Sequence, residues 1–233
     1  MKNFFQKYKH AWVSIYALIY LPWFYYLEKT ITQNYSLIQT SFDKKIPFIE
    51  FFIIPYLFWF LFMAVTVCYF FFKDRNEFYR LISFLVIGMT LFLIISTLWP
   101  NGQALRPKYF ERDNIFVDMV KHLYATDTPT NVFPSIHVYN TLGCYIAIKK
   151  SEHLKNIRWV QSATFVTTVL IILSTMFLKQ HSIIDGISAG IFAIISYVII
   201  YADEFKREQA YKQVPLKILV NVECCTQKGR DIL

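Results

Sequence analysis

The stretch FFIIPYLFWFLFMAVTVCYFFF, residues 51–72, contains no charged side chain. A helix needs about 20 predominantly apolar residues to cross the hydrocarbon core of a bilayer. A backbone in lipid must also satisfy its own hydrogen bonds, which a helix does within a single segment. The stretch therefore predicts a transmembrane helix and indicates an integral membrane protein.

The rest of the chain repeats this pattern. Of its 233 residues, 55% are hydrophobic and only 17% are charged, against about 25% charged residues in soluble proteins. The predicted fold is all-α, a polytopic membrane bundle with six transmembrane helices. Pro55 is expected to kink the second of them. The six predicted spans are Ala11–Leu27, Pro47–Phe72, Leu81–Trp99, Val132–Ile148, Ile157–Leu178 and Ile183–Tyr201.

One membrane domain, residues 1–201, is predicted, followed by a charged tail, residues 202–233. The first span is bulky and lacks a small-residue cleavage site, so it is expected to be a retained anchor. With the N-terminus in the cytoplasm, the inner segments hold 16 of the 24 Lys and Arg residues. Because cytoplasmic loops are enriched in these cations, both termini are predicted to be cytoplasmic. The basic surplus is thereby explained without a nucleic-acid partner.

Three polar clusters then fall at the outer ends of the predicted helices. They are NGQALRP (residues 101–107), NVFPSIH (131–137) and LKQHSIID (178–185). Although they are far apart in sequence, all three lie on the outer face, which predicts a functional site there.

His181 and Asp185 are four residues apart and can touch on a helix. A carboxylate that holds one ring nitrogen fixes the tautomer of a histidine and leaves the other nitrogen nucleophilic. The alternative is a surface pair in which Asp185 favours the start of a helix.

His137 follows Pro134 and Ser135, which suit the first turn of a helix. Free N–H groups at such a turn can hold an anion, and His137 could protonate it. The alternative is a capping loop with an interfacial histidine. Arg106 suits bidentate phosphate binding or snorkelling at the membrane surface, and Lys179 could be a second phosphate cation or an interfacial anchor.

Together these side chains predict phosphoryl transfer. The transferring charge would be stabilised electrostatically, and His137 would act as a general acid. The polar clusters contain no group of carboxylates for a divalent metal, so neither a metal nor another cofactor is expected. Cys68, Cys144, Cys224 and Cys225 show neither zinc spacing nor a disulfide framework.

The order Arg-Pro, Pro-Ser-x-His and His-x-x-x-Asp resembles the type 2 phosphatidic acid phosphatase superfamily of membrane lipid phosphatases and phosphotransferases. The resemblance covers roughly residues 95–190. It implies that His181 forms a phosphohistidine, that Asp185 orients it, and that His137 protonates the leaving alcohol. It also implies that Arg106 and Ser135 bind phosphate and that Ser174 matches the serine of the third family motif.

The sequence departs from the family motifs at three positions. The lysine of the first motif falls at Trp99, the arginine of the third at Thr175, and the glycine of the second at Ile136. Lys179 or Lys108 is a candidate replacement for the missing cations. The bulky Ile136 is similar to the branch containing inositol phosphorylceramide synthase-like proteins, which transfer phosphoryl headgroups between lipids.

The predicted function is hydrolysis of a lipid phosphate monoester or pyrophosphate at the outer face of the plasma membrane. The alternatives are a lipid phosphotransferase, a proton-relaying transporter and an inactive member of the family. Between the Arg-Pro and Pro-Ser motifs, apolar residues recur at helical spacing and predict a short amphipathic helix on the outer leaflet. These residues are Phe116, Met119, Val120 and Leu123.

Overall fold

The computed structural model describes residues 9–202. It divides into two compact units, residues 1–196 and 197–233, and every site residue considered below lies in the first. The predicted tail lies outside the described residues except for Ala202.

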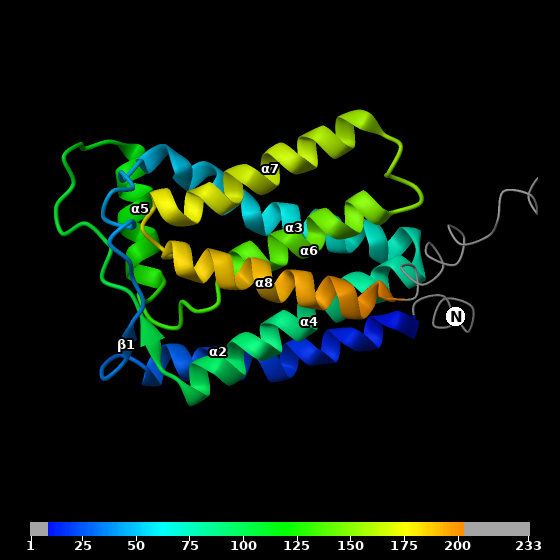
Figure 1. Cartoon of the computed structure of the whole chain (residues 1–233), viewed down its shortest axis with the longest axis horizontal. Helices are drawn as coiled ribbons and strands as arrows, with labels where there is room; N and C mark the ends of the chain where they lie inside the picture. The colour runs from blue at the N-terminus through cyan, green and yellow to red at the C-terminus, as the bar shows by residue number, and fades with distance from the viewer. Residues whose placement is uncertain (1–8, 203–233) are drawn as a thin grey trace, which may run out of the picture. The chain divides into compact units, whose positions relative to one another are not determined.

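The elements, coloured along the chain in Figure 1, are η1 (Lys9–Ile15), α2 (Tyr16–Thr30), β1 (Ser36–Leu37), η2 (Glu50–Phe52), α3 (Ile53–Lys73), α4 (Arg75–Leu98), β2 (Asn101–Gly102), α5 (Ile115–Thr126), α6 (Ile136–Lys150), α7 (Arg158–Phe177) and α8 (Ile183–Ile200).

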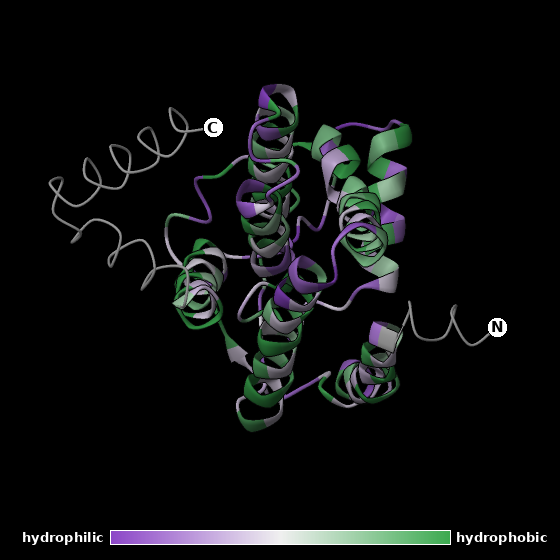
Figure 2. Cartoon of the chain, turned by 90° about the vertical axis from the view of Figure 1, so that its right-hand side faces the viewer, coloured by the Kyte–Doolittle hydropathy of each residue, from purple (hydrophilic) through white to green (hydrophobic). Residues whose placement is uncertain are grey.

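The predicted all-α membrane bundle is confirmed in class. Within residues 9–202, four segments are long and apolar enough to cross a membrane, namely Glu50–Lys73, α4, α7 and α8. The other two predicted spans correspond to α2 and α6, which have 15 residues each. Figure 2 shows hydrophobic residues along the helices and hydrophilic ones concentrated in the connecting loops.

α6 begins four residues later than its predicted span because two side chains fix its start. The Ser135 hydroxyl accepts the N–H of Val138 at 3.4 Å and caps the helix. The residues just before it are held by Asn101, whose Oδ1 accepts the N–H groups of Val132 and Phe133, each at 2.9 Å. Val132 and Phe133 therefore lie in a loop before α6 instead of in the helix.

The sequence predicted that Pro55, inside the second span, kinks that helix. α3 begins at Ile53, so Pro55 occupies its first turn. The first N–H groups of a helix have no partner within the helix, and the missing N–H of proline there breaks no hydrogen bond. The prediction of a kink at Pro55 is thus replaced by a helix start. Pro22 lies inside α2.

The centre of the bundle is built around α6, which packs against α3, α4 and α7. Two glycines allow a close approach of α4 and α6. A Cβ on Gly88 would lie 1.9 Å from the ring of Tyr139, and one on Gly143 would lie 2.6 Å from the ring of Phe84. The Tyr139 hydroxyl donates to the Phe84 carbonyl at 3.0 Å. This hydrogen bond joins the first turn of α6 to α4.

α5 confirms the helix predicted between the Arg-Pro and Pro-Ser motifs. It lies across one end of the other helices (Figure 1). Asn114 caps it by accepting the N–H groups of Phe116 and Val117, each at 3.0 Å. The α5 side chains Val117 and Val120 are fully buried against the rest of the bundle. At the same end of the bundle, β1 and β2 pair in parallel and join the loop after α2 to the loop after α4.

Candidate active site

The three polar clusters do meet at one end of the bundle. Asn101 joins the first cluster to the second through the hydrogen bonds already described. The N–H of Ser135 donates to the Asp185 carbonyl at 3.3 Å, which joins the second to the third. Gln103 Nε2 donates to the Lys179 carbonyl at 2.9 Å, which joins the first to the third. Topology and hydrogen bonding thus place them in one site.

Two histidines face each other at the centre of this site. His137 lies in the first turn of α6, and His181 lies in the turn between α7 and α8. His181 Nε2 and His137 Nδ1 are 3.4 Å apart. His181 is 8% exposed, and the His137 ring also contacts the Trp59 ring in a tilted arrangement, with 4.5 Å between centroids. Two imidazoles are therefore held beside one another by aromatic packing.

Asp185 lies behind His181, on the first turn of α8. Its Oδ2 is 3.4 Å from His181 Nδ1, and the carboxylate is fully buried. The same Oδ2 accepts the N–H of Ser182 at 2.9 Å. Asp185 is thus held on the side of the His181 ring away from His137. This places a carboxylate, an imidazole and a second imidazole in series.

The turn that carries His181 is built from backbone hydrogen bonds. The Thr175 carbonyl accepts the N–H groups of Gln180 and His181 at 2.9 and 3.0 Å. Lys179 has a φ of 54°, the left-handed conformation that reverses the chain after α7. His181 therefore lies on a tight, hydrogen-bonded turn.

Asp43, which the sequence analysis did not identify, holds this turn from the loop after α2. Its Oδ1 accepts the N–H of Ile183 at 2.9 Å, and its Oδ2 accepts the Ser182 hydroxyl at 2.7 Å. Burial opposes ionisation of Asp43, but these hydrogen bonds, with those from Thr40, outweigh it and lower the pKa of the carboxyl. An ionised carboxylate at a helix N-terminus is favourable.

Arg106 is bound to protein carbonyls. One terminal nitrogen donates to the carbonyls of Tyr124 and Asp127 at 3.2 and 2.8 Å. The other donates to the Thr128 carbonyl at 3.2 Å and to Gln180 Oε1 at 2.6 Å. Burial lowers the pKa of Arg106, although a guanidinium stays charged in proteins. Only its buried Nε has no partner among residues 9–202.

Asp127 is the second residue that the sequence analysis missed. Its Oδ2 accepts Gln180 Nε2 at 3.3 Å and the Tyr56 hydroxyl at 3.5 Å. Burial raises the pKa of this carboxyl, and the positive charge of Arg106 only partly offsets that effect. The segment ATDT gives no local signal for such a role, because its partners come from α3 and from the turn before α8.

The remaining predicted phosphate ligands have other partners in this structure. The Lys179 ammonium donates to the carbonyls of Asp43 and Ile46, and burial lowers its pKa. The Ser174 hydroxyl donates to the Ile171 carbonyl of its own helix at 2.6 Å. Lys179 and Ser174 would each have to exchange a protein partner to bind phosphate with these donors.

The two positions where family cations are missing have structural roles. Trp99 Nε1 donates to the Ser36 hydroxyl at 2.9 Å and so ties the end of α4 to β1. Thr175 is fully buried, and its hydroxyl donates to the Ile172 carbonyl at 2.8 Å.

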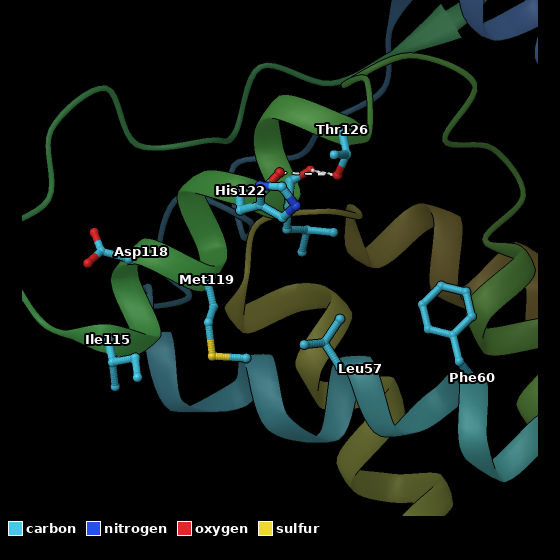
Figure 3. A pocket seen from close by; sticks show the side chains of 8 residues that line it. Leu57, Phe60, Ile115, Asp118, Met119, His122 and Thr126 are labelled. Carbon is cyan, nitrogen blue, oxygen red and sulfur yellow. Dashed lines mark hydrogen bonds between the residues drawn. The ribbon is translucent and has the colours of Figure 1, made fainter.

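A largely apolar cavity of about 660 Å³ adjoins His137. Its walls come mainly from α2, α3 and α6, and His137 and Asp127 also line it. A second groove of about 500 Å³ lies between α3 and α5 and shares Phe60, Leu123 and Thr126 with the cavity. Figure 3 shows Met119 of α5 and Leu57 of α3 pointing toward each other across this groove. An apolar chain could thus lie within reach of His137.

Comparison with known proteins adds one match. Residues 22–199 match the family model described as the PAP2 superfamily. No curated protein matches the chain, and no solved structure does.

Proposed function

Because the chain belongs to the PAP2 superfamily, we propose that it hydrolyses a lipid phosphate monoester or pyrophosphate through a phosphohistidine intermediate. The superfamily generally comprises phosphatases and phosphotransferases, and the apolar helices make this chain an integral membrane protein. The observation that carries the proposal is the series Asp185–His181–His137 beside an apolar cavity.

In the proposed first step, Asp185 keeps the proton of His181 on Nδ1, so that the Nε2 lone pair is free. Nε2 attacks phosphorus, the bond from phosphorus to the lipid oxygen breaks, and His137 gives a proton to that oxygen. In the second step water attacks the phosphohistidine, with neutral His137 taking its proton. Phosphate leaves, and His181 Nε2 regains its lone pair.

This chemistry requires the two rings to separate when substrate binds. In-line displacement puts the leaving oxygen on the side of phosphorus opposite the nucleophile. The two nitrogens, now 3.4 Å apart, must then lie on opposite sides of the phosphoryl group. The His137 ring contacts Tyr56 and Trp59 of α3, so the movement is proposed to involve this aromatic contact.

Charge on the phosphoryl group would be balanced by Arg106 and by the N-terminus of α6, which Ser135 caps. Arg106 already contacts Gln180, the residue before His181, at 2.6 Å. Exchange of a carbonyl partner for a phosphate oxygen would turn the guanidinium toward the nucleophile. Lys179, Lys108 and Ser174 remain further predicted donors in this proposal.

The proposed topology has six spans, with α2 (extended by η1) and α6 crossing together with the four longer helices. Both termini would face the cytoplasm, and the histidines would face the outside of the plasma membrane. Support comes from the alternation of the helices, which places every polar cluster at one end of the bundle (Figure 1).

A lipid phosphotransferase is the second candidate, in which an alcohol replaces water in the second step. The bulky Ile136 in Pro-Ser-x-His favours it. Transfer of labelled phosphate to an added alcohol would distinguish this reaction from hydrolysis.

The decisive experiment measures phosphate release by the purified protein in detergent from a panel of lipid phosphates. His181→Ala should abolish release. The matched control is His153→Ala, because His153 is exposed in the loop between α6 and α7 at the opposite end of the bundle. Equal activity of His181→Ala and the unaltered protein would refute the proposal.

A further inference from the structure

Asp127 has one carboxylate oxygen without a partner, and this residue lines the cavity of about 660 Å³ together with His137. Its Oδ2 accepts Gln180 Nε2 at 3.3 Å and the Tyr56 hydroxyl at 3.5 Å. Its Oδ1 accepts no hydrogen bond from residues 9–202, yet this oxygen is not closed off from accessible space. Asp127 as a whole is partly exposed. Oδ1 can therefore accept a hydrogen bond from a molecule in the cavity.

Two contacts connect Asp127 with the histidines of the proposed reaction. The Tyr56 ring, whose hydroxyl donates to Asp127, lies 4.8 Å from the His137 ring between centroids. Gln180, the other donor to Asp127, immediately precedes His181 in the chain. A single residue thus lies between the Asp127 carboxylate and each histidine. A small molecule that reaches His137 through the cavity also reaches Asp127.

This arrangement suits a nucleophile with two hydrogens to donate. His137 takes one proton from the nucleophile in the second proposed step. An unpaired carboxylate oxygen beside a largely apolar lining is costly, so Asp127 requires a second hydrogen. Burial raises the pKa of Asp127, and Arg106 only partly offsets that effect. The carboxylate is therefore more basic than an exposed one and accepts a hydrogen bond more strongly.

We propose that Asp127 determines which nucleophile attacks the phosphohistidine, an inference that rests on the proposed function. Water gives one proton to His137 and donates its other hydrogen to Asp127 Oδ1. The water oxygen bonds to phosphorus, the bond from phosphorus to His181 Nε2 breaks, and inorganic phosphate leaves. Asp127 accepts a hydrogen bond throughout and takes no proton.

The same requirement separates two kinds of alcohol. An alcohol with a second hydroxyl on the adjacent carbon donates one hydrogen to each residue, and it leaves as a phosphate monoester. An alcohol with a single hydroxyl loses its only donor hydrogen to His137 and leaves Asp127 Oδ1 unpaired. Asp127 therefore favours water and vicinal diols over simple alcohols.

The first test uses the unaltered full chain in detergent and needs no variant. The donor is the lipid phosphate that it hydrolyses fastest, radiolabelled in the phosphoryl group, and the acceptors are n-propanol and propylene glycol at equal concentration. Counted per hydroxyl group, transfer to propylene glycol should exceed transfer to n-propanol by about tenfold or more. This is the size expected for one hydrogen bond to a charged group.

The second test is Asp127→Asn. Because Tyr56 and Gln180 both donate to this side chain, the amide oxygen of the variant should turn toward them and its NH₂ group toward the cavity. The free acceptor is thereby replaced by a donor. Attack by water should slow by about tenfold, so that labelled phosphohistidine accumulates, and the preference for propylene glycol should disappear. Formation of the phosphohistidine in a single turnover should keep its rate.

The matched control is Glu28→Gln, which alters a carboxylate that holds the same loop. Glu28 accepts the Thr128 hydroxyl at 2.5 Å and Asn131 Nδ2 at 2.9 Å, but it does not line the cavity. This variant should neither accumulate phosphohistidine nor change the preference between the two alcohols. If both variants behave alike, the effect belongs to the structure of the loop and the role of Asp127 is refuted.

Other outcomes separate this role from the proposed function. Equal transfer to the two alcohols, or unchanged attack by water in Asp127→Asn, would overturn the role of Asp127 but leave lipid phosphate hydrolysis intact. No phosphate release from any lipid by the unaltered protein would overturn the proposed function and this inference with it.

Discussion

The Asp43 carboxylate accepts the backbone N–H of Ile183 at 2.9 Å across 140 residues of sequence. A loop near the start of the chain therefore caps α8, the helix that begins just after His181 and carries Asp185. Since the same carboxylate accepts the Ser182 hydroxyl, the position of the proposed nucleophile depends on a residue outside the three polar clusters.

Asp43→Ala should lower stability and kcat together. Removal of a side chain that caps a helix costs about 0.5–2 kcal/mol, and the Ser182 hydroxyl would lose its acceptor. Thermal unfolding and steady-state kinetics in detergent are the measurements. Asp43→Asn, which keeps an acceptor oxygen, should recover part of both, and kcat should change more than KM. An Ala variant with unchanged Tm and kcat would contradict this positioning role.

The ionisation of Asp43 should also make stability depend on pH. Its pKa is lowered in the folded protein, so its contribution is present above the unfolded value of 3.8 and is lost as the pH falls through the folded value. Tm measured between neutral and acidic pH should fall less steeply in Asp43→Asn than in the unaltered protein. Parallel curves would show that this carboxylate does not carry the acid sensitivity.

The ionisation of Asp127 should have the opposite effect on the pH dependence of stability. Burial raises its pKa, so the folded protein binds this proton more tightly than the unfolded chain does. Its contribution to stability then falls as the pH rises from the unfolded value of 3.8 through the folded one. Asp127→Asn should remove this decline, as seen in Tm against pH. A steeper decline in the variant would show that the ionised carboxylate is the stabilising form.

His137→Ala should slow lipid phosphate hydrolysis by about 10²–10⁴-fold, the usual contribution of a general acid. The loss should be much smaller with p-nitrophenyl phosphate, because a good leaving group departs with little help from a proton. Single-turnover rates with both substrates test this. Equal losses for the two would point to a role for His137 in binding instead.

Arg106→Lys should destabilise the site although it keeps the charge. The guanidinium makes four hydrogen bonds, three of them to the carbonyls of Tyr124, Asp127 and Thr128. An ammonium has three donors and lacks the planar fork. A Tm decrease corresponding to about 1–3 kcal/mol is expected for unmet buried acceptors. Lys108→Ala, at an exposed position in the same loop, is the control and should leave Tm unchanged.

Phosphate release should be unaffected by EDTA, because the proposed reaction uses only the side chains described. Rates before and after dialysis against the chelator are the measurement. Strong inhibition that is restored by one divalent cation would replace the metal-free mechanism.

The amino-acid sequence by itself determined the helical membrane class and the identity of the facing side chains. Apolar runs locate helices because lipid leaves the backbone no other way to satisfy its hydrogen bonds. Their alternation places all three polar clusters at one end. The four-residue spacing of His181 and Asp185 predicted that the two side chains could touch, but His181 lies in the turn before α8, so their observed contact also depends on the tertiary structure.

Only the tertiary structure decided how these side chains are held. Asp43 and Asp127 have partners far away in sequence, and the acceptors of Lys179 and Arg106 are mostly backbone carbonyls. Every residue has a carbonyl, so no residue type marks which of them a cation will meet.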